Sequence, residues 1–206
     1  TFIDESKRID LPEGVTEYNF LFDGVEPANG GSAGPGGVSV KSAQELVAAN
    51  DLDFMNNLTM YNEFYKQNDY KSTLVPWRLL YDKYPKSTLN LYIHGIVMYE
   101  DFLEKASTPA EKEAILDSLM NIYDQRIKYF GQKGYVLGRQ GTAWLKYHLP
   151  PAEDLSEEQL AAIYKKGYDM LLESAKEQGV ETEIPVVVLL MQTSRSLFSL
   201  GKLPKE

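Results

Sequence analysis

The chain has 206 residues, of which 43% are hydrophobic and 12% aromatic, enough apolar material for one sizeable core. It carries 21 lysines and arginines against 30 aspartates and glutamates, and this net charge of −9 disfavours binding to nucleic acid or anionic lipid. The absence of cysteine excludes disulfides, thiolate metal sites and cysteine nucleophiles.

The first 40 residues differ in composition from the rest of the chain. Residues 27–37 are almost entirely Gly, Pro, Ala, Asn and Ser, which is typical of a flexible linker. Before this linker lies an apolar cluster of Tyr18, Phe20, Leu21 and Phe22. Because exposed rings promote association, we expect this irregular, extended arm to be covered, either by a partner protein or by the chain's own helices. The predicted boundaries are therefore an arm and linker at 1–40 and a helical domain at 41–206.

Residues 41–105 repeat their apolar positions with the period of a helix, and no run alternates as a strand would. Ser87 is expected to cap the last helix of this region. The predicted main helices are 52–67, 70–84 and 88–105, and residues 44–49 are expected to form a weak opening turn or short helix.

Capping boxes mark the helices of the second half. Thr108 with Glu111 and Ser156 with Gln159 each place a capping side chain three residues before a reciprocating Glu or Gln. The predicted helices are 108–130, 135–148, 156–178 and 185–200. Seven main helices then form three antiparallel pairs and an unpaired last helix. That last helix is either the cap of a stack or the first half of a truncated repeat. The predicted fold is all-α.

Four residues have the spacing of a tetratricopeptide repeat, a pair of antiparallel helices that stacks into an α-solenoid. Phe64 would end the core face of the first helix, Tyr70 would mark the turn, and Trp77 would anchor the second helix. Pro85 would close the unit, because proline lacks an N–H and clashes with the preceding turn.

Two glycines support the same architecture. The first helix of a tetratricopeptide repeat has a small residue three positions before the ring at Phe64, and here that position holds Tyr61. One period of 34 residues later, the equivalent position holds the small residue Gly95. Leu91 precedes Gly95 by four residues, and the same pair returns as Leu137 and Gly141, followed by Trp144. A mid-helix glycine costs about 1 kcal/mol relative to alanine, so this register predicts close helix–helix contacts.

Residue patterns that carry chemistry are weak in this chain. Ser32 lies in a Gly-x-Ser-x-Gly match, but within the glycine linker and without the strand and helix that a nucleophile elbow needs. His94 and His148 have no metal-ligand spacing, and Glu100, Asp101 and Glu104 are typical of a solvated helix face. We therefore predict no catalytic residue, no metal and no cofactor, and we expect a protein that is not an enzyme.

A family resemblance extends over residues 61–147. It is carried by the stretches Leu119-Met120-Asn121-Ile122-Tyr123-Asp124-Gln125-Arg126-Ile127, Tyr129-Phe130-Gly131 and Val136-Leu137-Gly138-Arg139. These stretches resemble tetratricopeptide-like proteins of the Bacteroidota cell envelope. The resemblance implies an exported, non-enzymatic helical-repeat protein.

Two further observations favour an extracytoplasmic location. Asp117-Ser118-Leu119 resembles the acceptor triplet for O-linked glycans in Bacteroidota, and the chain begins at Thr1, as after removal of a secretory signal. No apolar run approaches the roughly 20 residues of a membrane-spanning helix, so direct membrane insertion is not expected.

The expected function is that of a protein-binding scaffold or accessory subunit of a cell-envelope complex, in the periplasm or at the cell surface. Its protein partner would bind the helical-repeat surface, with a possible contribution from the arm residues Tyr18, Phe20, Leu21 and Phe22. The alternative is an accessory protein that binds glycans through exposed aromatic residues.

Overall fold

The computed structural model describes residues 37–149 and 155–203, and within these ranges it contains helices and connections but no strand. The prediction of an all-α protein is therefore confirmed for the described part of the chain. Residues Tyr18, Phe20, Leu21 and Phe22 of the arm, as well as Ser32, lie outside the described residues.

Eight α-helices and one short 3-10 helix make up the described residues. They are α2 (Ala43–Ala48), α3 (Leu52–Lys66), α4 (Tyr70–Lys83), α5 (Asn90–Lys105), α6 (Pro109–Phe130), α7 (Lys133–His148), α8 (Glu157–Gln178), η3 (Gly179–Glu181) and α9 (Ile184–Ser199).

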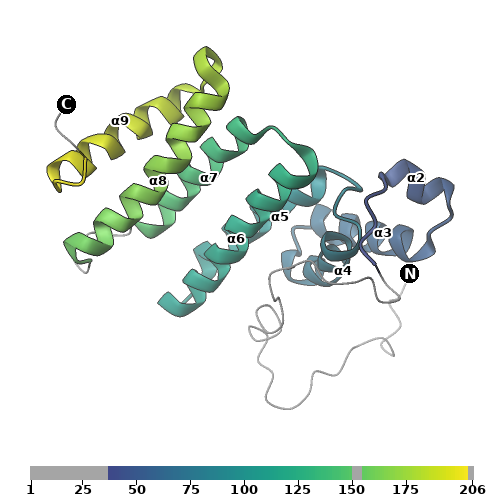
Figure 1. Cartoon of the computed structure of the whole chain (residues 1–206). Coiled ribbons are helices and arrows are strands. Elements are labelled where there is room, and N and C mark those ends of the chain that lie inside the picture. Colours follow the sequence, from purple (N-terminus) through teal and green to yellow (C-terminus); the bar gives the residue numbers. More distant parts are fainter. Residues whose placement is uncertain (1–36, 150–154, 204–206) are drawn as a thin grey trace.

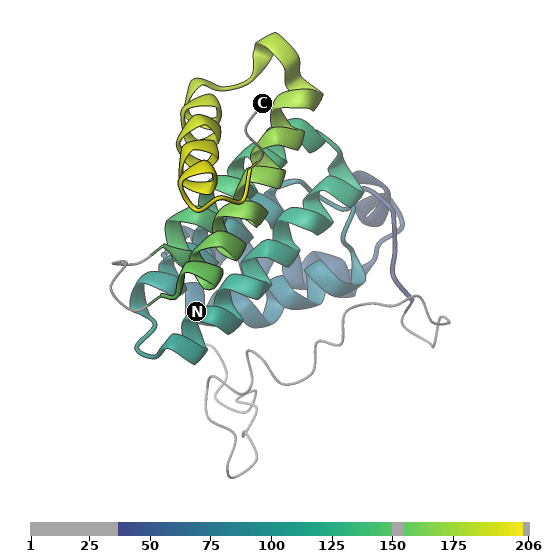
Figure 2. The ribbon, with the colours of Figure 1, turned by 60° about the vertical axis from the view of Figure 1, so that its left-hand side comes forward.

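The helices follow one another in space in the order of the sequence, from α2 at one end to α9 at the other (Figure 1). Each helix packs against its neighbour in the chain, most extensively α7 against α8 and then α3 against α4, while α5–α6 and α8–α9 pack to an equal extent. The last helix, α9, lies against α8 and also touches α7, as the turned view shows (Figure 2). The described chain is therefore an open row of helices rather than a bundle around one centre.

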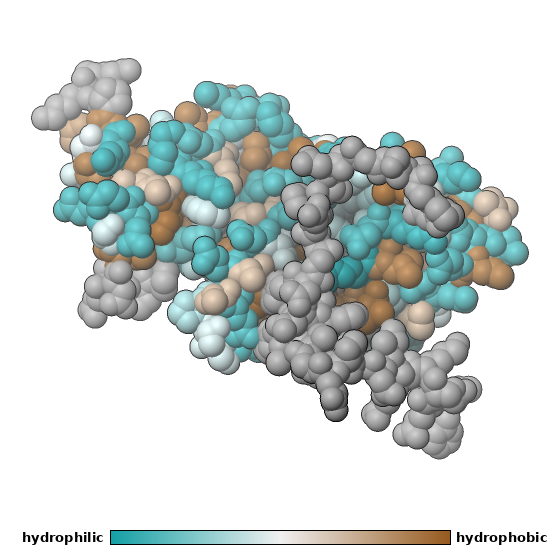
Figure 3. All heavy atoms as spheres, turned by 60° about the horizontal axis from the view of Figure 1, so that its bottom comes forward, coloured by the Kyte–Doolittle hydropathy of each residue, from teal (hydrophilic) through white to brown (hydrophobic). Residues whose placement is uncertain are grey.

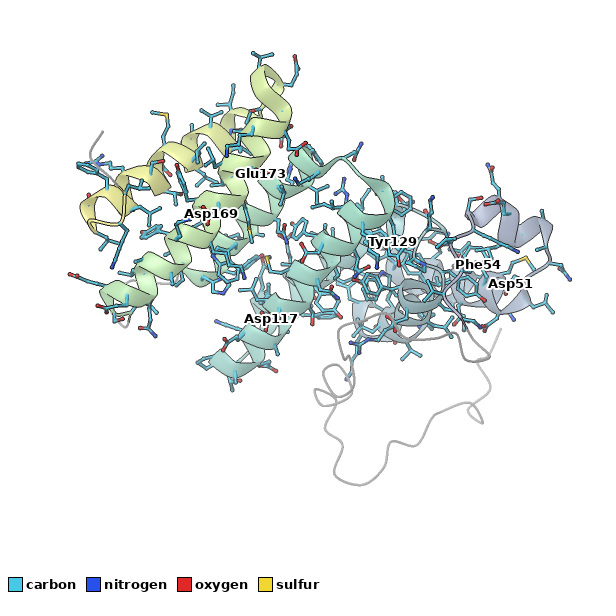
Figure 4. All side chains as sticks on the ribbon, viewed as in Figure 1. Asp51, Phe54, Asp117, Tyr129, Asp169 and Glu173 are labelled. Atoms are coloured by element: carbon cyan, nitrogen blue, oxygen red, sulfur yellow. The ribbon has the colours of Figure 1, made fainter. Side chains whose placement is uncertain are left out.

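Side-chain caps explain where several helices begin. The predicted capping boxes of Thr108 and Ser156 are both present, each hydroxyl accepting a hydrogen bond from the backbone N–H three residues on. Asp51 caps α3 by accepting from the N–H of Phe54 over 3.0 Å, and it also accepts from the hydroxyl of Tyr84 (Figure 4). The Phe54 ring packs edge-on against the ring of Tyr84, with centroids 5.3 Å apart. The start of α3 is thus fixed to the end of α4.

Two predicted helix starts are wrong. Ser87 does not cap α5: its hydroxyl is buried without a hydrogen-bond partner among the described residues, and α5 begins at Asn90. The reason is tertiary, since the Ser87 carbonyl accepts the N–H of Ala43 and holds this turn against α2. Helix α7 begins at Lys133, two residues earlier than predicted, so Gly134 is a buried helical residue and not part of the connector.

The apolar spacing of residues 156–178 predicts a buried stripe that includes Leu160, Tyr168, Leu171 and Leu172, and α8 departs from it in part. Leu171 is fully buried as expected, but Leu160, Tyr168 and Leu172 are half-exposed. Small residues take their place, because α7 approaches α8 through glycines and leaves little room for large side chains. The buried residues of α8 are Ala161, Gly167, Leu171 and Ser174.

Candidate functional site

The candidate site is a groove of about 350 Å³ formed by α5, α6 and α7. Its position follows from the pairing of the helices, since α6 forms the floor between the two helices that flank it. The residues that line it are Ile93, Ile96, Val97 and Glu100 of α5, Tyr123 and Arg126 of α6, and Tyr135, Arg139, Thr142, Ala143 and Lys146 of α7.

The apolar wall of the groove comes from α5. This helix buries Leu91, Tyr92 and Gly95 on its other faces, which leaves Ile93 and Val97, one turn apart, directed to the groove. These two side chains are 39% and 38% exposed. Adjacent exposed aliphatic residues in a concave surface are suited to covering an apolar group of a ligand.

Cationic side chains from α6 and α7 form the opposite wall. The guanidinium groups of Arg126 and Arg139 lie 5.5 Å and 5.1 Å from the centre of the Tyr135 ring. Arg139 also donates to a carboxylate oxygen of Glu183 at the start of α9, over 3.0 Å. Lys146 donates to the hydroxyl of Tyr147 over 2.8 Å. Positive charge therefore gathers in this groove, although the whole chain is acidic.

Burial shifts the pKa values of the groove residues. Burial lowers the pKa of the Arg126 guanidinium, and the positive charge of Arg139 acts in the same direction. Burial also raises the pKa of the Tyr123 phenol. It raises the pKa of Glu100 as well, against the opposing field of Lys146. The groove is thus a partly desolvated place in which an electrostatic contact is stronger than on the open surface.

Three of the four residues of the predicted repeat signature are near the core, and the fourth is not. Trp77 is 1% exposed, Pro85 is buried, and Tyr70 packs against the core. Phe64 is only half-buried and lies outside the core cluster. The rings that α3 directs at α5 are instead Tyr61 and Tyr65, which both contact the imidazole of His94.

Trp77 is buried, and its contacts extend beyond the pair α3–α4 to which the repeat spacing assigns it. Its indole N–H donates to the carbonyl of Leu91 in α5 over 2.8 Å. Its ring also fills the space beside Gly95, where an added Cβ would come within 2.6 Å of the ring. Trp77 therefore joins α4 to the following helix.

Gly95 and Gly141 both lie at close helix–helix contacts, in agreement with the prediction. A Cβ at Gly141 would be 3.1 Å from the side chains of Leu171 and Met170 in α8. Trp144 of the same helix is 9% exposed, and its indole N–H donates to the carbonyl of Ile163 over 3.0 Å. Gly141 and Trp144 thus belong to the contact between α7 and α8.

The two histidines lie among rings. The Tyr61 hydroxyl hydrogen-bonds Nδ1 of His94, and the Tyr65 ring stacks on the same imidazole at 3.8 Å. His148 packs on Trp144, and its Nδ1 lies 3.0 Å from the Trp144 carbonyl. Burial lowers the pKa of both imidazoles. Within residues 37–149 and 155–203, no group of three or more His, Cys, Asp or Glu side chains is placed to hold a metal ion.

The short acceptor-like motifs of the sequence fall on helices. Asn57-Leu58-Thr59 fits the N-glycosylation triplet, but Asn57 is buried in α3, where its amide donates to the Asp53 carbonyl over 2.8 Å. Asp117 and Ser118 lie in α6 (Figure 4), and the Ser118 hydroxyl donates to the Ala114 carbonyl over 3.0 Å. The side chains of Asn57 and Ser118 are therefore hydrogen-bonded within their own helices.

The groove residues have no functional motif in the sequence that would identify them. Arg126 stands in a polar run with Asp124 and Gln125, which is typical of a solvated helix face, yet the structure buries it. One signal was available on α7, where the groove residues Tyr135, Arg139, Thr142 and Lys146 are spaced by four, three and four. This spacing places a ring and two cations on one helix face.

A second exposed surface lies on α9. Apolar side chains on this helix, including Ile184 and Met191, are 78% and 68% exposed. Hydrophobic residues also form separate patches elsewhere among the hydrophilic ones, as the face in Figure 3 shows. The exposed residues Ile184, Val188 and Met191 recur at intervals of four and three, so they lie on one face of α9. Nothing among the described residues shows what covers this face, and it gives no preference for a ligand by itself.

Comparison of this chain with protein-family models, with curated proteins and with solved structures finds no match. Among the described helices, none has the length and apolar character required to cross a membrane.

Proposed function

We propose that this chain is a non-enzymatic helical-repeat scaffold that binds a segment of a protein partner in the groove of α5, α6 and α7. The observation that carries the proposal is the pairing of an exposed aliphatic wall, Ile93 and Val97, with a cationic wall that includes Arg126. Peptide segments present apolar and charged side chains side by side, and grooves between helices commonly bind them.

The finer assignment, a tetratricopeptide-like α-solenoid of the Bacteroidota cell envelope, is part of the same proposal. It is supported by the resemblance over residues 61–147 and by the packing of α3–α4, α5–α6 and α7–α8 as consecutive pairs. A location in the periplasm or at the cell surface follows from this resemblance. Fractionation of cells that express the full-length gene product tests the location.

A peptide selection tests the proposed binding. A displayed library of random 12-residue peptides is selected on the immobilised chain, and the affinity of an enriched peptide is then measured by fluorescence anisotropy. Val97→Trp fills the groove, so it is expected to weaken binding at least tenfold. Val187→Trp on α9 is the matched control, because Val187 is 40% exposed against 38% for Val97. Failure to enrich any peptide, or equal loss in both variants, would contradict the proposal.

A second candidate function is glycan binding through the exposed ring of Tyr135, which is 37% exposed in the groove. Sugar rings pack on exposed aromatic faces. Specific retention on a polysaccharide, lost in Tyr135→Ala and accompanied by no peptide enrichment, would favour this candidate over the scaffold.

A further inference from the structure

Arg126 is a buried cation whose guanidinium forms no ion pair with any carboxylate of residues 37–149 and 155–203. The residue is 7% exposed, and its Nε makes no hydrogen bond to any residue that the structure describes. Its one hydrogen bond within the described chain is long, with Nη2 donating to Oε1 of Gln132 over 3.4 Å. An uncompensated charge in a desolvated place is costly, so this guanidinium favours the arrival of an anion.

The surrounding charges indicate how much negative charge the ligand carries. Arg139 is already paired with Glu183, and Lys146 lies within electrostatic reach of Glu100. Among the cations of the groove, Arg126 is therefore the one near which the described residues supply no carboxylate. One carboxylate matches this single charge, whereas a phosphate dianion would bring an excess of negative charge. A carboxylate also fits the planar edge of a guanidinium, which can donate two parallel hydrogen bonds.

The neighbouring side chains indicate what lies beside the carboxylate. Ile93 and Val97 line the same groove and remain more than a third exposed, so they can cover an aliphatic or aromatic group. We propose that the bound partner segment contains an aspartate or glutamate whose side-chain carboxylate pairs with Arg126. An adjacent apolar residue of that segment packs on Ile93 and Val97. This inference rests on the proposed function and specifies the chemistry of the partner.

The test uses an enriched peptide from the selection and its variants. Each Asp or Glu of the peptide is changed to Asn or Gln in turn, and affinities are measured against the full chain and against Arg126→Met. We expect one amide change to weaken binding to the full chain by about ten- to a hundredfold, the usual effect of a charged hydrogen bond. Against Arg126→Met, the acidic and amide peptides should bind equally weakly. Lys128→Met, two residues away on α6 and outside the groove lining, should leave the preference unchanged.

The outcomes separate this inference from the proposed function. Peptides that lose affinity in Val97→Trp but bind equally in acidic and amide forms would overturn the Arg126 pairing and leave the groove as a binding site. The amide peptides test the pairing without altering the protein, so the result does not depend on how Arg126→Met folds. Removal of residues 1–36 provides a last check. If the acidic peptide binds at least tenfold more tightly to the shortened chain, Arg126 pairs with the chain's own arm, and the partner assignment is wrong.

Discussion

Two helix–helix contacts of this chain differ in the size of the residues that form them. Around α4 and α5 the contact consists of rings: Trp77 stacks on Tyr81 with centroids 4.9 Å apart, and Tyr81 packs against Tyr92. Between α7 and α8 the contact is rich in glycines, because a Cβ at Gly134 would come within 2.7 Å of Gln178 and one at Gly138 within 2.9 Å of Ser174. Large rings hold helices apart and fill the space, whereas glycines let backbones approach closely.

The two contacts nevertheless share one feature, a hydrogen bond from a tryptophan indole to a helix carbonyl. Trp77 donates to the Leu91 carbonyl and Trp144 to the Ile163 carbonyl, and in both cases a glycine follows four residues later, Gly95 and Gly167. A helical side chain covers the turn that precedes it, so a glycine at this position leaves the carbonyl accessible to an indole. This hydrogen bond joins α4 to α5, which belong to different helix pairs, but it joins α7 to α8 within one pair. The presence of this hydrogen bond is therefore determined by local packing and not by the repeat of helix pairs.

The largest effect is expected from removing the better-buried indole. Trp77→Ala should lower the free energy of unfolding by about 3–5 kcal/mol, because it deletes a fully buried ring and leaves a cavity. Trp144→Ala should cost less, because Trp144 lies at the edge of its contact and is 9% exposed against 1% for Trp77. Urea denaturation of both variants measures the difference. Equal losses of unfolding free energy in the two variants would show that Trp77 and Trp144 contribute equally to their contacts, despite their different burial.

A smaller effect is expected from adding a methyl group to the glycines. Gly95→Ala should destabilise the fold by about 1–3 kcal/mol, because its Cβ would come within 2.6 Å of the rigid Trp77 ring. Gly141→Ala should cost less, since its neighbours at 3.1 Å are side chains that can shift and alanine gains about 1 kcal/mol of helix propensity. Thermal and urea unfolding of both variants test this order. A stabilising Gly95→Ala would mean that the ring contact is loose.

Local signals in the sequence were sufficient to predict most helix ends. Thr108 and Ser156 cap their helices as expected, because a cap depends only on residues within one turn. Gly131 and Gly179 end α6 and α8 with positive φ angles of 72° and 57°, a conformation that favours glycine. Ser87 failed as a cap because the partner of its carbonyl, Ala43, is distant in sequence.

The groove could not be predicted for the same reason. Val97, Arg126 and Arg139 lie on three different helices, and only the packing of those helices brings them together. The sequence gives Arg126 the polar neighbours Asp124 and Gln125, so its burial depends on α7 and the ring of Tyr135. The glycine face of α7, in contrast, is indicated by residue spacing in the sequence. Gly134, Gly138 and Gly141 recur at intervals of four and three, but Gly134 had been assigned to the connector.

The smallest effect concerns pH and involves His94 of α5, which packs among the rings of Tyr61 and Tyr65 of α3. Burial lowers the pKa of His94 below its ordinary value of 6.5, so the folded state binds fewer protons than the unfolded state near this pH. The stability contributed by neutral His94 is therefore present above pH 6.5 and is lost as the pH falls toward the lower, folded-state pKa. His148 has a shift of the same sign and contributes in the same pH range.

His94→Asn isolates the first of these contributions, because asparagine keeps a hydrogen-bonding group for Tyr61 and does not titrate. Unfolding free energies measured from pH 7.5 to pH 5.5 should decline less steeply in this variant than in the parent chain. Identical slopes would show that His94 is not desolvated in the folded protein.

The central claim is that a partner segment binds between α5, α6 and α7, and site-specific photo-crosslinking tests it most directly. A benzophenone amino acid replaces Val97 in one chain and the equally exposed Val187 of α9 in another. Each chain is irradiated with the peptide enriched by selection, and adducts are located by mass spectrometry. We predict an adduct at position 97 that excess unlabelled peptide abolishes, and no adduct above background at position 187. Equal labelling at both positions, or labelling at 187 alone, would contradict the assignment of this groove as the binding site.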